Sequence, residues 1–575
     1  MKNVEIAALL EETADLLEFM GANPFRVRAY RNAARALLDS ADSVASLLAD
    51  PERRLTEIAG IGADLADKVA ALCRTGSFPL LLELRAQVPQ SVLALVRIPG
   101  LGPKKAAVLH KELKITSLDE LRAACLAQQV RGLKGFGAKT EQTILAGIAL
   151  ASSAQERLLW AEADDWAQRI LVHLRAAPNV EQLEAAGSYR RGRETVGDLD
   201  FLAVSSHPQE VMERLSTFAD AAETIGRGDT KMSVRLATGL QVDLRVVPAE
   251  SFGAALLYFT GSKDHNVVLR GRAKDRGLKI NEYGVFRDDR YLAGRTEEEI
   301  YATLDLPWFP PELREARREF EWADAGALPL LIEQGDIQGD LHMHTTESDG
   351  RASLEQMAEA AQARGLKYIA ITDHSKRVSM ANGLDGARLR KQWAEIDRLN
   401  QMLRGLTVLK GVEVDILEKG GLDLEDDVLA EADWVVASIH YGQNQPREQI
   451  TSRILGALAN PHVSAIAHPT GRLLNRRKPY DVDLEVVLQA AREHGKLMEL
   501  NANPSRLDLD DLACAAAKRK GIPIVISTDA HGIDGLDKLR YGILQARRGG
   551  LAKADVANAL PWKQMRQQIG KSRDR

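Results

Sequence analysis

The sequence predicts a chain of several domains: a helical amino-terminal region, a mixed α+β region, and a carboxy-terminal region built on a parallel sheet or barrel. Three observations lead to this prediction. Helical stretches separated by Gly-x-Gly turns fill the first 150 residues, strand-like stretches appear after about residue 155, and apolar runs alternate with helical segments beyond about residue 337. At 575 residues the chain is also too long for one core, since domains hold roughly 100–200 residues each.

The composition indicates a globular protein without disulfide bonds. Hydrophobic residues make up 45% of the chain and charged residues 27%, which argues against a long disordered region. The three cysteines, Cys73, Cys125 and Cys514, are too scattered for a disulfide framework or a thiolate metal site. Without an apolar stretch long enough to span a membrane, we expect a cytoplasmic protein. We also expect it to be a monomer. The net charge of -5 does not show whether the chain binds nucleic acid, because bound cations would cancel part of the acidic charge.

The amino-terminal region repeats one small pattern, a Gly-hydrophobic-Gly turn between two helical stretches. The copies are Gly60-Ile61-Gly62, Gly100-Leu101-Gly102 and Gly135-Phe136-Gly137. A helical period follows, as in Leu65, Val69 and Leu72 after the first copy, so each turn should lie at a tight corner between helices. Such a corner points backbone N–H groups outward at a helix N-terminus, where an anion such as a DNA phosphate is favoured.

This spacing resembles the helix-hairpin-helix motif, which clamps DNA phosphates without reading sequence. Lysines flank two of the turns, at Lys104, Lys105, Lys134 and Lys139. The alternative is that the hairpins merely pack together, and three copies with flanking lysines favour DNA binding. The residues that the resemblance assigns to DNA contact are Gly60, Gly62, Gly100, Gly102, Gly135, Gly137 and Lys104.

Three acidic residues are predicted to meet on adjacent strands of the middle region. Residues 198–206 and 240–247 read as strands, so Asp198 and Asp200 project from one face while Leu199 and Phe201 enter the core. Asp243 joins them from the neighbouring strand. Three carboxylates repel one another, and two Mg²⁺ ions roughly 3.5–4 Å apart would relieve that repulsion. One ion would activate a hydroxyl and the other would hold a triphosphate.

Together with the Gly187-Ser188 turn, this cluster resembles the nucleotidyl transferase signature of the polymerase beta superfamily. The run Tyr258-Phe259-Thr260-Gly261-Ser262, followed by Asn266 and Arg270, resembles the nucleotide-binding and template-pairing segment of family X DNA polymerases. The resemblance implies an α+β palm and a thumb, with Asp198, Asp200 and Asp243 catalytic and Arg270 on the template strand. It assigns nucleotide binding to Gly187, Ser188, Arg191, Gly197, Tyr258, Phe259, Gly261, Lys263 and Asn266.

Two lysines bear on how far this resemblance extends. Lys263 stands where the family's vertebrate members have an acidic residue, and we expect it to strengthen nucleotide binding even without metal. Lys68 falls at the Schiff-base lysine of the family's small lyase domain, which the resemblance also places on DNA. A nucleophilic lysine must lose its proton, whereas Asp64 and Asp67 nearby favour the charged amine. We therefore predict binding of a 5′ phosphate by this region and leave lyase chemistry open.

The histidines of the last region follow apolar strand-like runs, together with three acids. They are His342, His344, Asp349, His374, Glu413, His440, His468, Asp529 and His531. One such histidine is more often a packing residue, but nine residues at the carboxyl ends of parallel strands predict a centre for up to three Mn²⁺ or Zn²⁺ ions. The blocks resemble the polymerase and histidinol phosphatase (PHP) family, which implies a distorted (β/α)7 barrel, Mn²⁺-dependent 3′–5′ exonuclease activity and cleavage at abasic sites.

The predicted domains follow these motifs. A lyase-like helix-hairpin-helix domain covers 1–80, helix-hairpin-helix fingers 81–150, the palm 151–250, the thumb 251–315, a linker 316–336 and the PHP phosphoesterase 337–575. We expect gapped or nicked double-stranded DNA and dNTPs as substrates, in gap-filling base excision repair and in end joining. The alternatives are a phosphatase of small metabolites and a DNA-end-binding scaffold with phosphoesterase activity only.

Overall fold

A computed structural model describes residues 3–39, 44–50, 53–58, 60–88, 95, 101, 103–138, 140–145 and 157–573. The chain divides into two compact units, Met1–Glu156 and Arg157–Arg575. Each unit has its own hydrophobic core. Among the described residues no helix has the length and apolar character needed to cross a bilayer.

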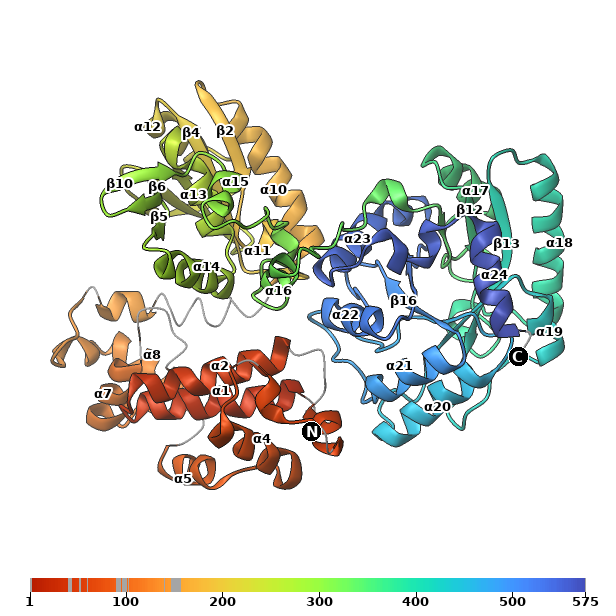
Figure 1. Ribbon diagram of the computed structural model, residues 1–575, viewed down its shortest axis with the longest axis horizontal. Coiled ribbons are helices and arrows are strands. Elements are labelled where there is room, and N and C mark those ends of the chain that lie inside the picture. Colours follow the sequence, from red (N-terminus) through yellow and green to blue (C-terminus); the bar gives the residue numbers. More distant parts are fainter. Residues whose placement is uncertain are drawn as a thin grey trace. The chain divides into compact units, whose positions relative to one another are not determined.

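The first unit is helical (Figure 1). Its elements are α1 (Asn3–Phe19), α2 (Pro24–Asp39), α3 (Val44–Ala49), η1 (Leu55–Glu57), α4 (Ala63–Thr75), α5 (Pro79–Gln87), α7 (Pro103–Leu113), α8 (Leu118–Leu126) and η3 (Val130–Gly132). One core joins Leu10 of α1 to Leu109 of α7, both fully buried. The ranges 1–80 and 81–150, which we predict as separate domains, therefore share a single core in the described residues.

A five-stranded sheet lies at the centre of the palm. Its strands, in spatial order, are β2 (Val180–Ala185), β4 (Asp198–Ser205), β7 (Gln241–Val246), β6 (Lys231–Leu236) and β5 (Ala221–Arg227). Helices α10 (Trp160–Arg175) and α12 (Pro208–Ser216) cover one face, onto which Leu199 and Phe201 point. Leu202 and Val204 point to the other face and pack on α13 (Phe252–Thr260). The predicted strands and their alternation are confirmed.

The polypeptide around this sheet completes the palm and thumb. Short strands β1 (Leu158–Leu159) and β3 (Thr195–Val196) pair beside α11 (Gly187–Arg190), and η4 (Ala249–Ser251) precedes α13. After α13 come α14 (Lys263–Asp275), β8 (Lys279–Asn281), β9 (Gly284–Arg287), β10 (Arg290–Ala293), α15 (Glu297–Ala302), η5 (Pro311–Leu313) and α16 (Glu319–Asp324). Buried Glu297 holds this part together, because its carboxylate binds both Arg190 of α11, at 2.7 Å, and Arg314, at 2.5 Å.

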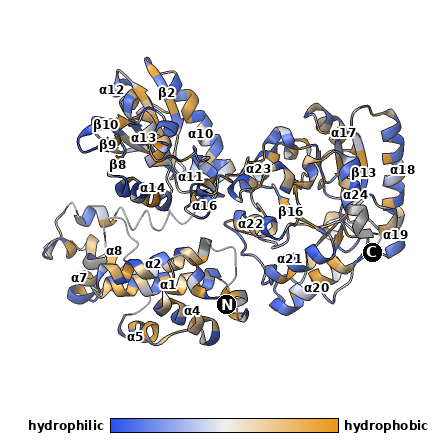
Figure 2. Cartoon of the chain, viewed as in Figure 1, coloured by the Kyte–Doolittle hydropathy of each residue, from blue (hydrophilic) through white to orange (hydrophobic). Residues whose placement is uncertain are grey.

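Seven parallel strands form the carboxy-terminal barrel, in the order β11 (Gly339–Asp340), β12 (Tyr368–Ile371), β13 (Thr407–Asp415), β14 (Trp434–Ser438), β15 (Ala465–Ile466), β16 (Leu497–Asn501) and β17 (Ile524–Ser527). A bridge from Met343 to Ala530 nearly closes the ring between the first and last strands. Figure 2 shows hydrophobic residues along strands such as β13 and hydrophilic residues on the outer helix α18. The predicted parallel α/β barrel is confirmed.

Helices lie around the strands of this barrel (Figure 1). They are α17 (Leu354–Ala363), α18 (Gly386–Met402), α19 (Asp426–Glu431), α20 (Arg447–Ala459), α21 (Leu484–Glu493), α22 (Asp511–Arg519), α23 (Leu539–Arg548) and α24 (Trp562–Arg573). Short 3-10 turns connect them: η6 (Gln334–Asp336), η7 (Ser379–Ala381), η8 (Ile533–Lys538), η9 (Lys553–Asp555) and η10 (Ala557–Ala559). The strands supply the buried core and leave their carboxyl ends for the connecting loops.

Candidate active sites

The palm brings the three predicted acids together. Asp198 and Asp200 lie on β4, and the parallel register pairs Asp200 with Asp243 of β7. Since side chains alternate along a strand, the two β4 carboxylates share the α13 face while Leu199 between them is fully buried on the opposite face. The acid cluster is thus a direct consequence of strand alternation and register.

Like charges and burial shift the acids of this cluster in different directions. Burial, with Asp198 and Asp243 nearby, raises the pKa of Asp200 to about 7. The pKa of Asp198 is raised by burial and by Asp243. Burial also acts to raise the pKa of Asp243, but hydrogen bonds from Ser233 and from Lys231, whose Nζ lies 3.0 Å from Asp243 Oδ2, lower it. A divalent cation would relieve this repulsion, so the donor set fits the two Mg²⁺ ions expected.

The turn before β4 lies directly against Asp200 and carries a buried hydroxyl without a hydrogen-bond partner among the described residues. Gly187 has a left-handed backbone, φ 65°, and a Cβ there would lie 2.4 Å from Asp200 Oδ2, so only glycine fits. The Oγ of Ser188 is buried and has no hydrogen-bond partner among the described residues. A buried donor without a partner is costly unless a ligand supplies one.

A pocket of about 630 Å³ opens beside the acids. It is lined by Arg157, Gly187, Ser188, Arg191, Arg193, Asp198, Asp200, Tyr258, Phe259, Thr260, Gly261, Ser262, Lys263, Asp264, Asn266, Arg270 and Glu315. The structure therefore brings most of the expected nucleotide-binding residues to one cavity. Two predicted residues do not line this pocket: the third acid, Asp243, and Gly197, where a Cβ would lie 2.9 Å from the Arg157 guanidinium.

Hydrogen bonds order the wall of this pocket that faces the acids. The Arg191 guanidinium donates to the carbonyl of Thr260 and lies 3.3 Å from Glu315 Oε1. Asn266 donates to the carbonyl of Tyr258 at 2.8 Å, while its buried Oδ1 has no partner among the described residues. Lys263 and Arg270 are exposed on α14, one near its start and one two turns later.

Sequence reasoning missed four charged residues of this pocket, which are Arg157, Arg193, Asp264 and Glu315. Arg157 and Arg193 add positive charge beside the acids, and Glu315 pairs with Arg191. Arg193 lies five residues after Ser188 and two after Arg191, so its position was a usable signal, but Arg157 lies in a segment without a motif. Glu315 ends the predicted thumb, and nothing in the sequence marks it as a pocket residue.

The second site lies at the carboxyl ends of the barrel strands. His342, His344 and Asp349 follow β11, and His374 follows β12. The remaining predicted ligands lie at the ends of later strands: Glu413 on β13, His440 after β14, His468 after β15, and Asp529 and His531 after β17. The barrel therefore gathers all nine predicted ligands.

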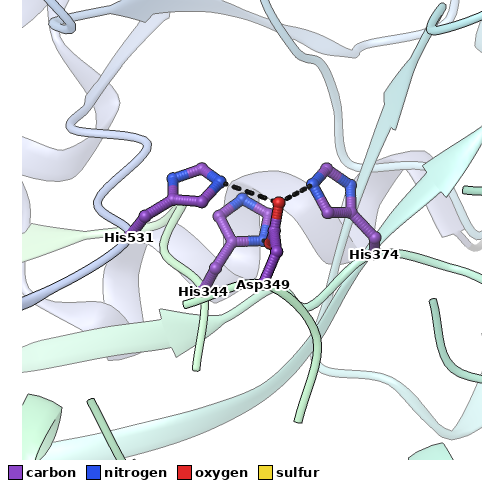
Figure 3. Close-up of side chains that lie close together, drawn as sticks. All are labelled: His344, Asp349, His374 and His531. Carbon is purple, nitrogen blue, oxygen red and sulfur yellow. Dashed lines mark ion pairs between the residues drawn. The ribbon is translucent and has the colours of Figure 1, made fainter. Parts of the chain in front are cut away.

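These side chains form three overlapping groups that could hold metal ions: His344 with Asp349, His374 and His531; His342 with His344 and Asp529; and His374 with Glu413 and His440. Figure 3 shows the first group, in which Asp349 Oδ2 lies 3.4 Å from His531 Nε2 and 3.6 Å from His374 Nε2. His468 approaches from the other side, with its Nε2 3.0 Å from Glu413 Oε1.

The chemistry of these side chains fits cations. Buried His342 Nε2 and His344 Nε2 have no hydrogen-bond partner among the described residues, and Glu413 Oε2 lies 2.8 Å from His374 Nδ1. Burial acts to lower the pKa of His374, but Glu413 and Asp349 raise it to about 10. Without a metal ion, the positive charge that offsets these acids therefore comes from a protonated histidine. Imidazole and carboxylate ligands without thiolate suit Mn²⁺ or Zn²⁺.

Two acids that sequence reasoning did not single out orient the ligands. Glu499 of β16 accepts from His342 Nδ1 at 2.7 Å, and Asp415 of β13 lies 3.0 Å from His440 Nδ1. Carboxylates of this kind fix the ring orientation of a metal-binding histidine. Their position near strand ends was a usable signal. Asp373, beside His374, instead accepts hydrogen bonds from Thr345 and so supports the loop.

The turns of the first unit have the backbone that the motif requires where they are described. Gly60 and Gly135 have left-handed φ angles of 94° and 89°. Gly62 is the N-cap of α4, and Gly137 directly precedes the last helical residues described in this unit, 138 and 140–145. Gly100, Gly102 and Lys139 lie outside the described residues, and Lys104 belongs to α7.

Lys68 is held as a charged group. Its Nζ pairs with Asp64 and lies 5.4 Å from the centre of the Tyr30 ring. Burial acts to lower the pKa of Lys68, but hydrogen bonds to Asp64 and Tyr30 raise it overall. This environment favours phosphate binding over nucleophilic attack.

Comparison with known proteins finds relatives of the helical unit, of the thumb and of the barrel. Family models match the DNA polymerase beta thumb at residues 255–315, the PHP domain at 340–503, a helix-hairpin-helix domain at 1–78 and a SAM-like helix-hairpin-helix tandem at 92–149. The DNA polymerase/3′-5′ exonuclease PolX of Bacillus subtilis is 43% identical over 564 residues, 97% of this chain and 98% of that protein.

A second kind of relative matches a smaller part of the chain. A probable phosphatase of a Thermoanaerobacter species is 31% identical over 230 residues, which is 38% of this chain and 89% of that protein. The similarity to the Bacillus subtilis protein, by contrast, runs through both sites and the helical region. The chain therefore belongs to the family X DNA polymerases that carry a carboxy-terminal PHP domain.

Proposed function

We propose that this chain fills short gaps in double-stranded DNA during repair and trims 3′ ends with its barrel. Polymerase and 3′–5′ exonuclease activities follow from membership of the family. The observation that supports the pairing most directly is the presence of two complete ligand clusters on one chain, the acids at β4 and β7 and the nine residues of the barrel. Its substrates would be dNTPs and gapped or nicked DNA, in the cytoplasm and as a monomer.

At the palm, Asp198, Asp200 and Asp243 would hold two Mg²⁺ ions, which would lower the pKa of the primer hydroxyl and offset the charge of the triphosphate. Ser188 offers its unpartnered hydroxyl to phosphate oxygens, and Arg191 adds a fixed charge. The sugar of the incoming nucleotide packs on Tyr258 and Phe259, and Asn266 reaches the base edge. Arg270, exposed on α14, contacts the template strand.

Lys263 is proposed to add metal-independent affinity for the nucleotide. It is exposed at the start of α14 and lines the pocket, so its ammonium can reach phosphate oxygens directly. In EDTA, Lys263→Asp should weaken binding of a dNTP at least tenfold. An unchanged dissociation constant would contradict this role.

At the barrel, the nine ligands would hold up to three Mn²⁺ or Zn²⁺ ions, which would make water a better nucleophile near neutral pH and offset the charge of the phosphate. Glu499 and Asp415 keep His342 and His440 in ligand orientation. We propose that this site removes 3′-terminal nucleotides and cleaves at abasic sites. In the first unit, the hairpin turns and Lys68 would bind the 5′ phosphate of a gap, and because Lys68 is held charged we assign it phosphate binding.

One experiment tests both sites together. Primer extension and primer degradation should be followed on a gapped duplex with Mg²⁺ and Mn²⁺ compared. We expect template-directed extension, fastest on a short gap with a 5′ phosphate, and 3′ degradation that Mn²⁺ supports best. Degradation without any extension would instead support a DNA-end-binding scaffold with phosphoesterase activity only.

A further inference from the structure

A short segment of the barrel contacts residues at two pockets. The pocket beside the palm acids is here called the nucleotidyl transfer pocket, and the pocket lined by Asp349, His374, Glu413, His440, His468, Asp529 and His531 is here called the metal pocket. Residues 472–478, here called the basic bridge, form the middle of the loop between β15 and α21. On the palm side, Arg472 Nη2 lies 2.8 Å from Glu194 Oε2, and Asn475 donates to the carbonyl of Arg157 at 2.5 Å. Arg157 lines the nucleotidyl transfer pocket, so the basic bridge borders that pocket.

The same segment also borders the metal pocket. Arg472 Nε donates to the carbonyl of Arg506 at 2.9 Å, and the N–H of Leu474 donates to the carbonyl of Ser505 at 2.7 Å. Arg506 lines the metal pocket, where its Nε lies 3.5 Å from Asp529 Oδ2. One segment of chain therefore contacts lining residues, or their neighbours, at both sites.

The basic bridge is built as a rigid turn with charged residues facing solvent. Leu473 and Arg477 exchange backbone hydrogen bonds of 2.9 and 2.8 Å, and Arg477 also donates to the carbonyl of Gly471. The side chains of Arg476, Arg477 and Lys478 are exposed. Among the residues that the structure describes, Arg476 and Lys478 have no ion-pair partner. Their charge is thus available to a ligand.

Positive charge continues beyond both ends of the basic bridge. Arg157 and Arg193 line the nucleotidyl transfer pocket, and Arg506 lines the metal pocket. Phosphates spaced along a nucleic acid strand are the ligand that matches a row of cations. A single strand suits this path better than a duplex, because Glu413 and His468 of the metal cluster are almost fully buried and a strand end must enter to reach them.

We propose that the basic bridge binds the phosphates of a single DNA strand whose 3′ end passes between the nucleotidyl transfer pocket and the metal pocket. This inference rests on the proposed function, since it needs a 3′ end at both sites. Arg476 and Lys478 make the phosphate contacts, while buried Arg472 holds the segment against both sites. The bridge contributes to binding of the strand and takes no part in the chemistry.

The test uses the full chain with Arg476→Glu and Lys478→Glu together. A matched control reverses two charges elsewhere, with Lys391→Glu and Arg398→Glu. Both residues are exposed on α18, on the outside of the barrel. Binding of a labelled single strand and of a blunt duplex is measured by fluorescence anisotropy in EDTA over a range of salt. Mn²⁺-dependent hydrolysis is then measured on the single strand and on the p-nitrophenyl ester of thymidine 5′-monophosphate.

We expect the bridge variant to bind the single strand at least tenfold more weakly. Its salt slope should be smaller by about 1.4, since each lost contact to a single strand removes about 0.7. The KM for degradation of the strand should rise in parallel, while ester hydrolysis, duplex binding and the control variant stay near the values of the unmodified chain.

Three results would overturn the proposal: unchanged affinity and salt slope, an equal loss in the control variant, or an equal loss of duplex binding. The binding readout needs no catalysis, so it decides the role of the basic bridge by itself. If the unmodified chain hydrolysed neither the strand nor the ester, the proposed nuclease function would fail instead.

Discussion

At the scale of single residues, the three acids of the palm repel one another, and a bound cation would relieve that repulsion. Asp200 is enclosed by Asp198, by Asp243 and by the Gly187 turn, which approaches so closely that a Cβ would meet its carboxylate at 2.4 Å. Burial and the neighbouring acids raise the pKa of Asp200 to about 7. Without metal, this carboxyl therefore holds a proton over part of the physiological range.

The raised pKa predicts a pH dependence of Mg²⁺ binding at the palm. The ion must displace the proton of Asp200, so the affinity for Mg²⁺ should fall as the pH drops below about 7 and level off above it. Calorimetric titration with Mg²⁺ in buffers of different ionisation enthalpy would measure the released proton. Asp200→Asn should abolish that release. Release that persists in Asp200→Asn would assign the proton to another group.

At the scale of elements, helix α23 of the barrel packs directly on the turn that ends α11. Gly192, at φ 65°, lies so near Leu544 that a Cβ there would meet the Leu544 Cγ at 2.5 Å. Gly239 has a similar φ of 90° but open space around it. The two glycines therefore separate the cost of backbone strain from the cost of a steric clash.

Gly192→Ala should consequently destabilise the chain more than Gly239→Ala. Both variants incur a left-handed backbone cost of about 1–2 kcal/mol, and only Gly192→Ala adds overpacking of about 1–3 kcal/mol. Thermal unfolding of both variants measures the difference. Equal melting temperatures would show that α23 does not press on this turn.

The helical unit is expected to supply the preference for gaps. Because residues on both sides of position 80 share one core, the truncation that respects the structure removes residues 1–156. Without the hairpin turns, the ratio of extension on gapped DNA to extension on an open template should fall at least tenfold, while the rate at saturating open template changes little. The two ratios come from parallel primer extension assays. An unchanged ratio would contradict this role of the helical unit and would assign the preference for gaps to the palm.

How much of these elements the sequence predicts depends on the range of the interactions. Alternation of polar and apolar residues suffices to place Asp198, Asp200 and Asp243 together, and strand ends suffice to gather the barrel histidines. The role of Glu315 could not be predicted, because it follows from a contact with Arg191, more than a hundred positions away.

At the scale of the whole molecule, an ion network ties the barrel to the nucleotide-binding turn. Arg548 of α23 lies 3.0 Å from Glu315 Oε1 and donates to the carbonyl of Arg191 at 2.8 Å. Glu315 also binds Arg191, so one carboxylate is shared between the barrel arginine and the arginine expected to hold the triphosphate. Burial acts to raise the pKa of Glu315, but Arg548 and Arg191 lower it to about 2, so it stays ionised.

This sharing predicts opposite effects of two substitutions on nucleotide binding. Arg548→Ala leaves Glu315 to be neutralised by Arg191, which should weaken dNTP binding about tenfold, a loss of about 1.4 kcal/mol. Glu315→Gln frees Arg191 and should strengthen it. Both dissociation constants can be measured by fluorescence, with circular dichroism to confirm folding, because breaking a buried ion pair costs about 3–5 kcal/mol. Changes of the same sign would contradict the network.

The central claim is that one chain carries two chemically separate active sites, and a pair of rates tests it most directly. Extension and Mn²⁺-dependent 3′ degradation should be measured for Asp200→Ala and for His342→Ala with His344→Ala, with melting curves to show that each variant is folded. Asp200→Ala should lower nucleotide incorporation by several orders of magnitude and leave degradation intact. The histidine substitutions should abolish degradation and leave extension intact. Degradation that survives the loss of His342 and His344, or that disappears with Asp200, would contradict the assignment of the nuclease to the barrel.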